Sequence, residues 1–235
     1  MRLQKYMASS GVASRRSCES IINESRVKVN GKIVNVMGYK VDPERDVVQV
    51  DDKVIKLNLN YEYYILNKPI GVVCTAKDEK NRPTVVDMIE SKKRLYPVGR
   101  LDIDSTGLVL LTNDGELTNK ILHPRNKIKK TYIATVEGKP SKEGLEKLRN
   151  GIFLDGAKTS PAKVDILKVY ETDSIVKITI TEGRNHQVKN MFLKIGNPVK
   201  KLKRISIGEI ELGGLEQGYY RPLEKEELDY LRSIR

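Results

Sequence analysis

From Tyr61 onward, strand-like and helix-like segments follow one another without a regular β-α-β alternation. Residues 108–112 (LVLLT) form an apolar run typical of a buried strand, and residues 131–138 (TYIATVEG) alternate as a strand does. Further strand patterns cover residues 162–169, 175–181 and 204–212 (RISIGEIEL), and helix patterns lie between and after the strands. This order predicts an α+β fold with a mixed, largely antiparallel sheet.

The N-terminal part of the chain has its own helix and strand signals. Ser14 is a candidate N-cap for the second of two short helices. Residues 26–34 (RVKVNGKIV) alternate, and their Asn30-Gly31 pair is typical of a type I′ hairpin turn. These signals predict a small α/β unit ahead of the larger sheet.

A change in the sequence pattern separates this unit from the rest of the chain. Residues 53–60 (KVIKLNLN) carry no clear pattern and are interpreted as a linker. The strand and turn signals of the larger sheet begin directly after it. We therefore expect one domain over residues 1–59 and a second over residues 60–235.

The charge of the chain indicates the kind of partner it binds. Lys and Arg number 43 against 31 acidic residues, which gives a formal net charge of +12. Seven of these cations lie in residues 183–204, which contain no acid. Such clustering favours nucleic acid over a membrane surface. The expected RNA-binding residues are Arg2, Lys5, Arg15, Arg16, Arg26, Lys28, Arg100, Arg184, Lys203 and Arg204.

Several classes of protein are disfavoured by what the sequence lacks. No segment approaches the roughly eighteen apolar residues of a membrane span, and the first residues lack the apolar core of a secretory signal. Cys18 and Cys74 stand apart without a CxxC, and His123 and His186 form no metal-binding pair. No nucleotide-binding glycine motif is present. We expect a soluble, cytoplasmic monomer that uses no metal and no cofactor.

Two aspartates stand out in GRLDIDSTGLVLLTNDG, residues 99–115. Asp104 is interpreted as a turn residue that hydrogen-bonds the backbone near Gly107. The DIDST spacing matches phosphatases that form an aspartyl phosphate, but residues 96–100 are too poor a strand for that chemistry. Asp102 could instead act as a nucleophile at a sugar carbon, because a uracil leaving group can carry its own negative charge.

The N-terminal segment resembles a known RNA-binding domain. RLQKYMASSGVASRRSCESII, followed by RVKVNG, resembles the S4 domain over about the first fifty residues. The helix pair and the hairpin occur together and in the family's order. The resemblance implies binding of structured RNA and, by itself, no chemistry.

The remainder resembles the pseudouridine synthases, in the branch that modifies ribosomal RNA and carries an S4 domain. GRLDIDSTGLVLLTNDG resembles their nucleophile motif. Four further segments match the family in order, spanning with it nearly all of residues 61–223: YYILNKPIGVVCT, KKTYIATVEG, EGRNHQVKNMF and LKRISIGEIELGGLEQGYYRPL. The resemblance implies an S4-like domain followed by a pseudouridine synthase catalytic domain.

The same resemblance implies three catalytic roles. The Asp of the RLD triplet is the family's nucleophile, here Asp102, and the Tyr of the K-x-Y segment is a candidate general base, here Tyr132. The basic residue that pairs with the nucleophile is Lys189, where many relatives carry Arg with its planar fork. His186 is interpreted as an exposed polar residue at a helix start, without a catalytic role.

The implied reaction is isomerisation of a specific uridine to pseudouridine in ribosomal RNA or a ribosomal subunit precursor. KPIGVVCTAKDEKNRPTVVDMI looks like the large-subunit (23S) members and HQVK like the small-subunit (16S) ones, and we favour the large subunit. Direct attack of Asp102 on C1′ and removal of the C2′ proton both stay open. The alternative is a non-catalytic RNA-binding or ribosome-assembly protein, which would not require Asp102.

Overall fold

A computed structural model describes residues 1–57 and 60–234 and contains two compact units. The first consists of Met1–Glu62 with Lys92–Arg94 and Asn113–Gly115, and the second holds the remaining residues. The expected domain boundary after residue 59 falls at the edge of residues 58–59, which belong to the expected linker and lie outside the described residues.

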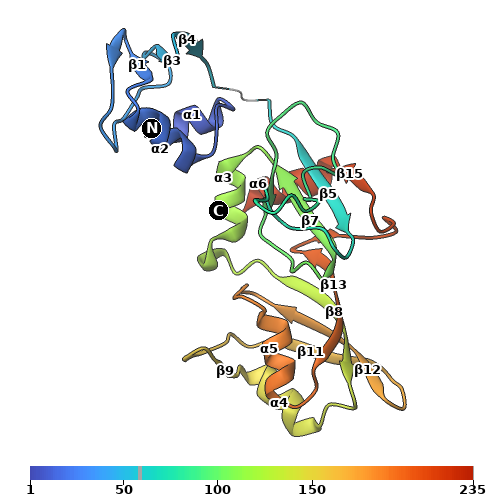
Figure 1. The fold of residues 1–235 in the computed structure, drawn as a ribbon. Coiled ribbons are helices and arrows are strands. Elements are labelled where there is room, and N and C mark those ends of the chain that lie inside the picture. Colours follow the sequence, from blue (N-terminus) through green and yellow to red (C-terminus); the bar gives the residue numbers. More distant parts are fainter. Residues whose placement is uncertain (58–59, 235) are drawn as a thin grey trace. The chain divides into compact units, whose positions relative to one another are not determined.

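The first unit packs two short helices against a small sheet (Figure 1). The sheet is antiparallel, with strand order β2-β1-β3-β4. Aliphatic side chains from both helices and from β1 and β3 form its core. The elements are α1 (Leu3–Ser9), α2 (Arg15–Asn23), β1 (Val27–Val29), β2 (Lys32–Ile33), β3 (Val48–Val50) and β4 (Lys53–Ile55).

Local sequence signals account for most of this unit. Ser14 caps α2, because its side chain accepts a hydrogen bond from the Ser17 amide at 3.1 Å. Asn30 and Gly31 have φ of 51° and 78°, as a type I′ turn requires, so the expected hairpin is confirmed. The expected linker is wrong for residues 53–55, which pair with β3 as strand β4.

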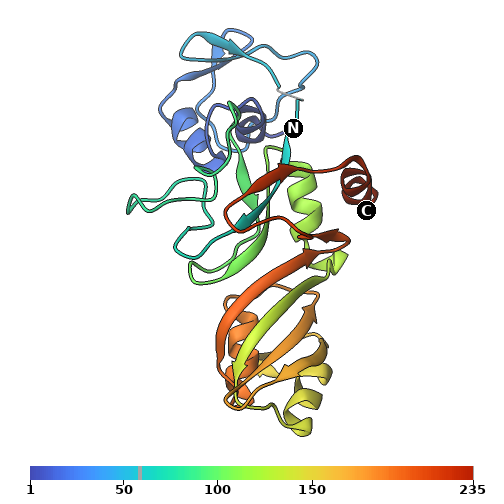
Figure 2. The same ribbon diagram turned by 90° about the vertical axis from the view of Figure 1, so that its right-hand side faces the viewer.

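The second unit is built on a nine-stranded sheet whose main strand order is β11-β12-β8-β13-β7-β5-β15 (Figures 1 and 2). Among its described strands, only β13 and β7 pair in parallel. The expected α+β fold with a mixed, largely antiparallel sheet is therefore confirmed.

The elements of this unit, in chain order, are β5 (Tyr63–Lys68), β6 (Tyr96–Val98), β7 (Thr106–Thr112), α3 (Gly115–Leu122), a 3₁₀ turn (Pro124–Asn126), β8 (Lys130–Glu137), α4 (Lys142–Asn150), β9 (Phe153–Leu154), β10 (Ala157–Lys158), β11 (Lys163–Val169), β12 (Asp173–Ile180), α5 (Gln187–Lys194), β13 (Val199–Ile207), β14 (Ile210–Glu211), β15 (Tyr220–Pro222) and α6 (Lys225–Ser233).

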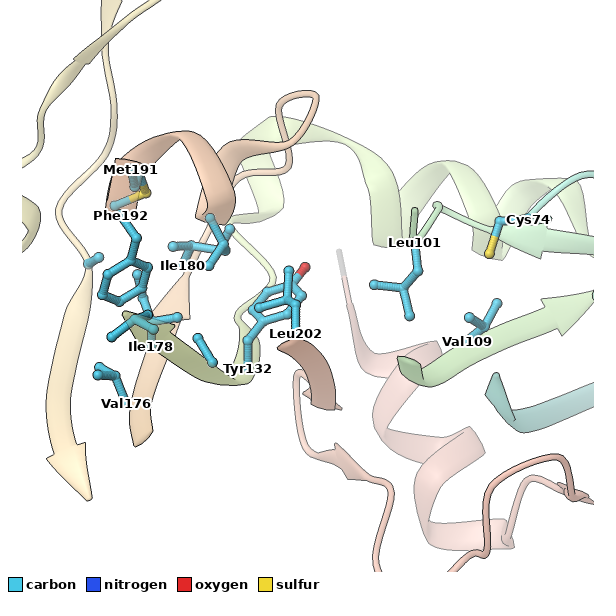
Figure 3. Close-up of a cluster of buried hydrophobic side chains, with 14 of the residues drawn as sticks. Cys74, Leu101, Val109, Tyr132, Val176, Ile178, Ile180, Met191, Phe192 and Leu202 are labelled. Atoms are coloured by element: carbon cyan, nitrogen blue, oxygen red, sulfur yellow. The ribbon is translucent and has the colours of Figure 1, made fainter. Parts of the chain in front are cut away.

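Two hydrophobic clusters stabilise this sheet. One holds α4 and α5 against β8, β11 and β12, and Figure 3 shows Met191 and Phe192 of α5 near Ile178 of β12. The other holds α3 and α6 against β5, β7 and β14. Alternate residues of β7 enter the two clusters, so the apolar run at 108–111 is buried on both faces. No helix in the described ranges is long and apolar enough to cross a membrane.

Candidate active site

The segment that carries the two aspartates connects β6 to β7 and is held by several hydrogen bonds. The Ser105 amide donates to the Asp102 carbonyl at 3.1 Å and closes a turn. The Ile103 carbonyl accepts from the Gly71 amide at 2.9 Å and from Lys68 Nζ at 3.4 Å. Lys68 is fully buried, and this burial lowers its pKa. The backbone around Asp102 is therefore fixed by Lys68 at the end of β5 and by Gly71 in the β5–β6 connection.

The structure brings Asp102 and Lys189 together. Lys189 Nζ lies 3.0 Å from Asp102 Oδ2 and 2.6 Å from Asp104 Oδ1. Lys189 projects from the first turn of α5, which packs on the sheet through Val188 and Phe192. Asp104, expected only as a turn residue, thus shares this ammonium with Asp102.

Two pKa shifts follow from this shared contact. Burial disfavours the charge on Lys189, but its hydrogen bonds to Asp104 and Asp102 outweigh that effect and raise the pKa of Lys189 above its usual value. The hydrogen bond from Lys189 is the main reason that the pKa of Asp104 lies below its usual value. The contact therefore favours an ionised Asp104 beside a charged Lys189.

His186 also lies against Asp102, a contact that the sequence analysis missed. Its Nε2 is 3.3 Å from Asp102 Oδ1, and its side chain is half-exposed. The residue adopts a left-handed conformation, φ 49°, at the N-cap of α5. The signal that could have found it is spacing, because residues three apart at a helix start share a face, and His186 precedes Lys189 by three.

Tyr132 lines the same pocket as Asp102. It lies on β8, 7% exposed, beside Leu202 of β13 (Figure 3), and it pairs in register with Arg204. The pocket measures about 240 Å³, and Lys130, Gln187 and His186 also line it. Within residues 1–57 and 60–234, no group of three or more His, Cys, Asp or Glu side chains is placed to hold a metal ion.

Of the expected RNA-binding residues in this unit, Arg100 and Lys203 are exposed. Arg204, also expected to bind RNA, is instead buried: it is 3% exposed and donates to the Leu108 and Arg100 carbonyls. Its position on β13, the strand between β8 and β7, carries it into the interior. Arg184 is half-buried and donates to three carbonyls of the β9–β10 hairpin, and no ion pair joins it to Asp102 in the described structure.

The expected RNA-binding residues of the first unit fall into two groups. Arg2, Arg15 and Arg16 are exposed, and Lys5 is half-buried. The two others form ion pairs at 2.6 to 2.9 Å: Arg26 with Asp51 and Glu24, and Lys28 with Asp52. Among these six residues, Arg2, Arg15 and Arg16 are therefore the exposed cations that lie outside these ion pairs.

Comparison with known proteins finds a matching family for each of the two units. Residues 62–194, more than half of the chain, match the family described as RNA pseudouridylate synthase, and residues 1–47 match the S4 domain. The chain belongs to the RNA pseudouridylate synthase family. It is therefore an isomerase, and most residues that line the pocket around Asp102 lie in the matched synthase segment.

Relatives of this synthase match it over nearly its whole length. It is 46% identical to ribosomal large subunit pseudouridine synthase B of Bacillus subtilis (strain 168), over 99% of this chain and 96% of that protein. It is 38% identical to ribosomal small subunit pseudouridine synthase A of Haemophilus influenzae, over 98% and 99% respectively. A solved crystal structure of a pseudouridylate synthase matches 98% of this chain with a TM-score of 0.72 and 37% identity.

Proposed function

We propose that this synthase converts one uridine of large-subunit ribosomal RNA to pseudouridine, with Asp102 as its nucleophile. The observation that carries this proposal is the position of Asp102 at the pocket wall, 27% exposed and 3.0 Å from Lys189. The Asp102 carboxylate is held beside the Lys189 ammonium and remains reachable by a substrate. The pocket, about 240 Å³ in volume, has room for a single base and for the edge of its sugar that faces the pocket.

The reaction begins when the target uridine leaves its stack, since C1′ and C5 are otherwise shielded. Asp102 then attacks C1′, or it removes the C2′ proton to give a glycal. In either route the N1–C1′ bond breaks and its electron pair leaves with the uracil. The uracil turns, C5 bonds to C1′, and a base removes the C5 proton. Tyr132 is our candidate for this base, because it lies in the same pocket.

The first unit and the exposed basic residues support RNA as the partner. A unit of the S4 type presents Arg2, Arg15 and Arg16 to solvent, and arginine suits phosphate contacts. The greater identity to the large-subunit relative, together with the KPIGVVC segment, supports 23S RNA as the substrate. We propose that the enzyme acts in the cytoplasm, on ribosomal RNA or a ribosomal subunit precursor.

Pseudouridine mapping in a strain that lacks this protein tests the proposal. We expect one 23S position to remain uridine in the deletion strain. Expression of the wild-type chain should restore the modification, and expression of Asp102→Asn should not. Unchanged 23S and 16S maps would refute the proposed function, and a missing site in 16S alone would refute the large-subunit assignment.

A further inference from the structure

Lys130 is a pocket residue to which the proposed mechanism gives no role. It is the lysine of the K-x-Y segment and lies two residues before Tyr132 on β8, so both side chains share one face of the sheet. Its Nζ donates to the Ile128 carbonyl at 3.1 Å. No carboxylate forms an ion pair with Lys130 within the described part of the chain.

Arg204 is a second pocket cation without a carboxylate partner in the described structure. It pairs with Tyr132 across β8 and β13, and it donates only to main-chain carbonyls, those of Leu108 and Arg100. Its Nη2 is buried without a hydrogen-bond partner among the described residues. Burial lowers the pKa of Lys130, and the charge of Arg204 lowers it further. On this side of the pocket, a lysine whose charge is disfavoured and a buried guanidinium thus stand without a carboxylate partner in the described chain.

The reaction itself supplies a matching negative charge. Before bond cleavage, the charge is on the Asp102 carboxylate, beside Lys189. Direct attack converts that carboxylate to a neutral ester, and proton removal converts it to a neutral acid. In both routes the uracil leaves as an anion, with its charge spread over N1 and the carbonyl oxygens. One negative charge therefore moves from Asp102 to the base.

We propose that Lys130 is a catalytic residue that donates a hydrogen bond to the departing uracil anion, with the Arg204 guanidinium adding positive charge behind it. The inference rests on the proposed function and deepens it, since it assigns the residue that receives the moving charge. A cation that meets charge only as the bond breaks stabilises the transition state more than the bound uridine. Lys189 thus stabilises the negative charge on Asp102 at the start of the cleavage step. Lys130 stabilises the same charge on the uracil at its end.

Substrates with different leaving groups distinguish this role from a structural one. Lys130→Gln keeps a donor for the Ile128 carbonyl but removes the charge, and Lys130→Met removes both. Lys129→Gln removes the same charge from the exposed neighbouring residue and is the matched control. Each full-length variant is given an RNA fragment with uridine, or with 5-fluorouridine, at the mapped target. The measured quantity is consumption of that nucleoside in a single turnover.

With uridine RNA, both Lys130 variants should lose about a hundredfold in rate, the cost of removing one transition-state donor, while Lys129→Gln stays near wild type. With 5-fluorouridine the loss should shrink by about tenfold, because fluorine at C5 makes the uracil anion a weaker base that needs less stabilisation. The affinity for RNA should change little.

Equal losses on both RNAs would overturn the proposal, as would wild-type rates for Lys130→Gln, which indicate a purely structural hydrogen bond to Ile128. Either Lys130 variant serves if the other fails to fold. Failure of the wild-type protein to consume either nucleoside would instead refute the proposed function, so the two failures are distinguishable.

Discussion

At the scale of single residues, the site is a cluster in which one lysine contacts two carboxylates. Lys189 lies 3.0 Å from Asp102 and 2.6 Å from Asp104, although Asp104 is much the more exposed of the two. The shorter contact therefore goes to the carboxylate that has no proposed chemical role. Asp104 positions the ammonium, and the ammonium in turn holds the Asp102 carboxylate in place.

Replacing Lys189 tests this positioning. Lys189→Met should lower the single-turnover rate by roughly a hundredfold, because a partly buried carboxylate loses its charged hydrogen-bond partner. Lys189→Arg keeps the charge and should stay within about tenfold of wild type. The rates are measured on the same RNA fragment under saturating enzyme. A methionine variant with wild-type activity would remove Lys189 from the catalytic site.

Replacing Asp104 tests the ion pair through its pH dependence. The folded-state pKa of Asp104 is lowered, so its contribution to stability is present above the ordinary aspartate pKa of about 3.9 and disappears as pH falls through the folded value. Because the carboxylate is largely exposed, Asp104→Asn should cost at most about 1 kcal/mol at pH 7. Urea unfolding at pH 7, 5 and 3 measures this difference. A difference that grows as pH falls contradicts the ion pair.

At the scale of elements, the start of β7, the strand that follows the two aspartates, is fixed by its close approach to β13. Gly107 has φ +105°. A Cβ at this position would overlap the Arg204 carbonyl oxygen and would lie 2.7 Å from the Arg204 backbone nitrogen. The two strands pair in parallel at this point. Gly107 is therefore required by backbone contact between strands, and not only by the turn that the sequence predicts.

Gly107→Ala should consequently lower the free energy of unfolding by about 3 kcal/mol or more, since it adds a clash to an unfavourable φ. Gly218→Ala is the matched control: its φ is +92°, but nothing lies within 4 Å of the added Cβ. That control should cost only the backbone strain, about 1 kcal/mol. Equal unfolding midpoints for the two variants in urea would show that the β7–β13 contact can relax.

The sequence predicts elements well where their signals are local. The Asn30-Gly31 turn, the Ser14 cap and the apolar strand at 108–111 are all present as expected. The pattern of residues 204–212 predicts one strand, but Gly208 breaks it into β13 and β14, which pair as a hairpin.

Features that depend on distant parts of the chain escape sequence reasoning. The burial of Arg204 follows from the place of β13 between β8 and β7, and the contact of His186 with Asp102 joins residues 84 positions apart. Neither feature produces a periodic pattern in the local sequence, because tertiary packing decides which segments lie side by side. The sequence alone left Arg100, Arg184 and Lys189 as candidate partners of Asp102, and the family resemblance singled out Lys189.

At the scale of the whole molecule, RNA affinity should depend on which surface charges are free. Arg15→Gln with Arg16→Gln should lower the slope of log affinity against log salt by roughly 0.7 to 0.9 for each lost phosphate contact. Arg26→Gln with Lys28→Gln should change the slope less, because acidic neighbours already neutralise these two residues. Fluorescence anisotropy with a 23S fragment at several salt concentrations compares the pairs. A larger effect for the second pair would contradict the assignment.

The most direct test of the account is pseudouridine formation by the wild-type protein and by Asp102→Asn on one 23S RNA fragment in a single turnover. The substitution keeps the shape of the side chain and removes the ionised oxygen that the reaction needs. We expect the wild type to convert one uridine, and the variant to bind the RNA with similar affinity and form no product. Turnover by Asp102→Asn within about tenfold of wild type would contradict the central claim that Asp102 is the nucleophile.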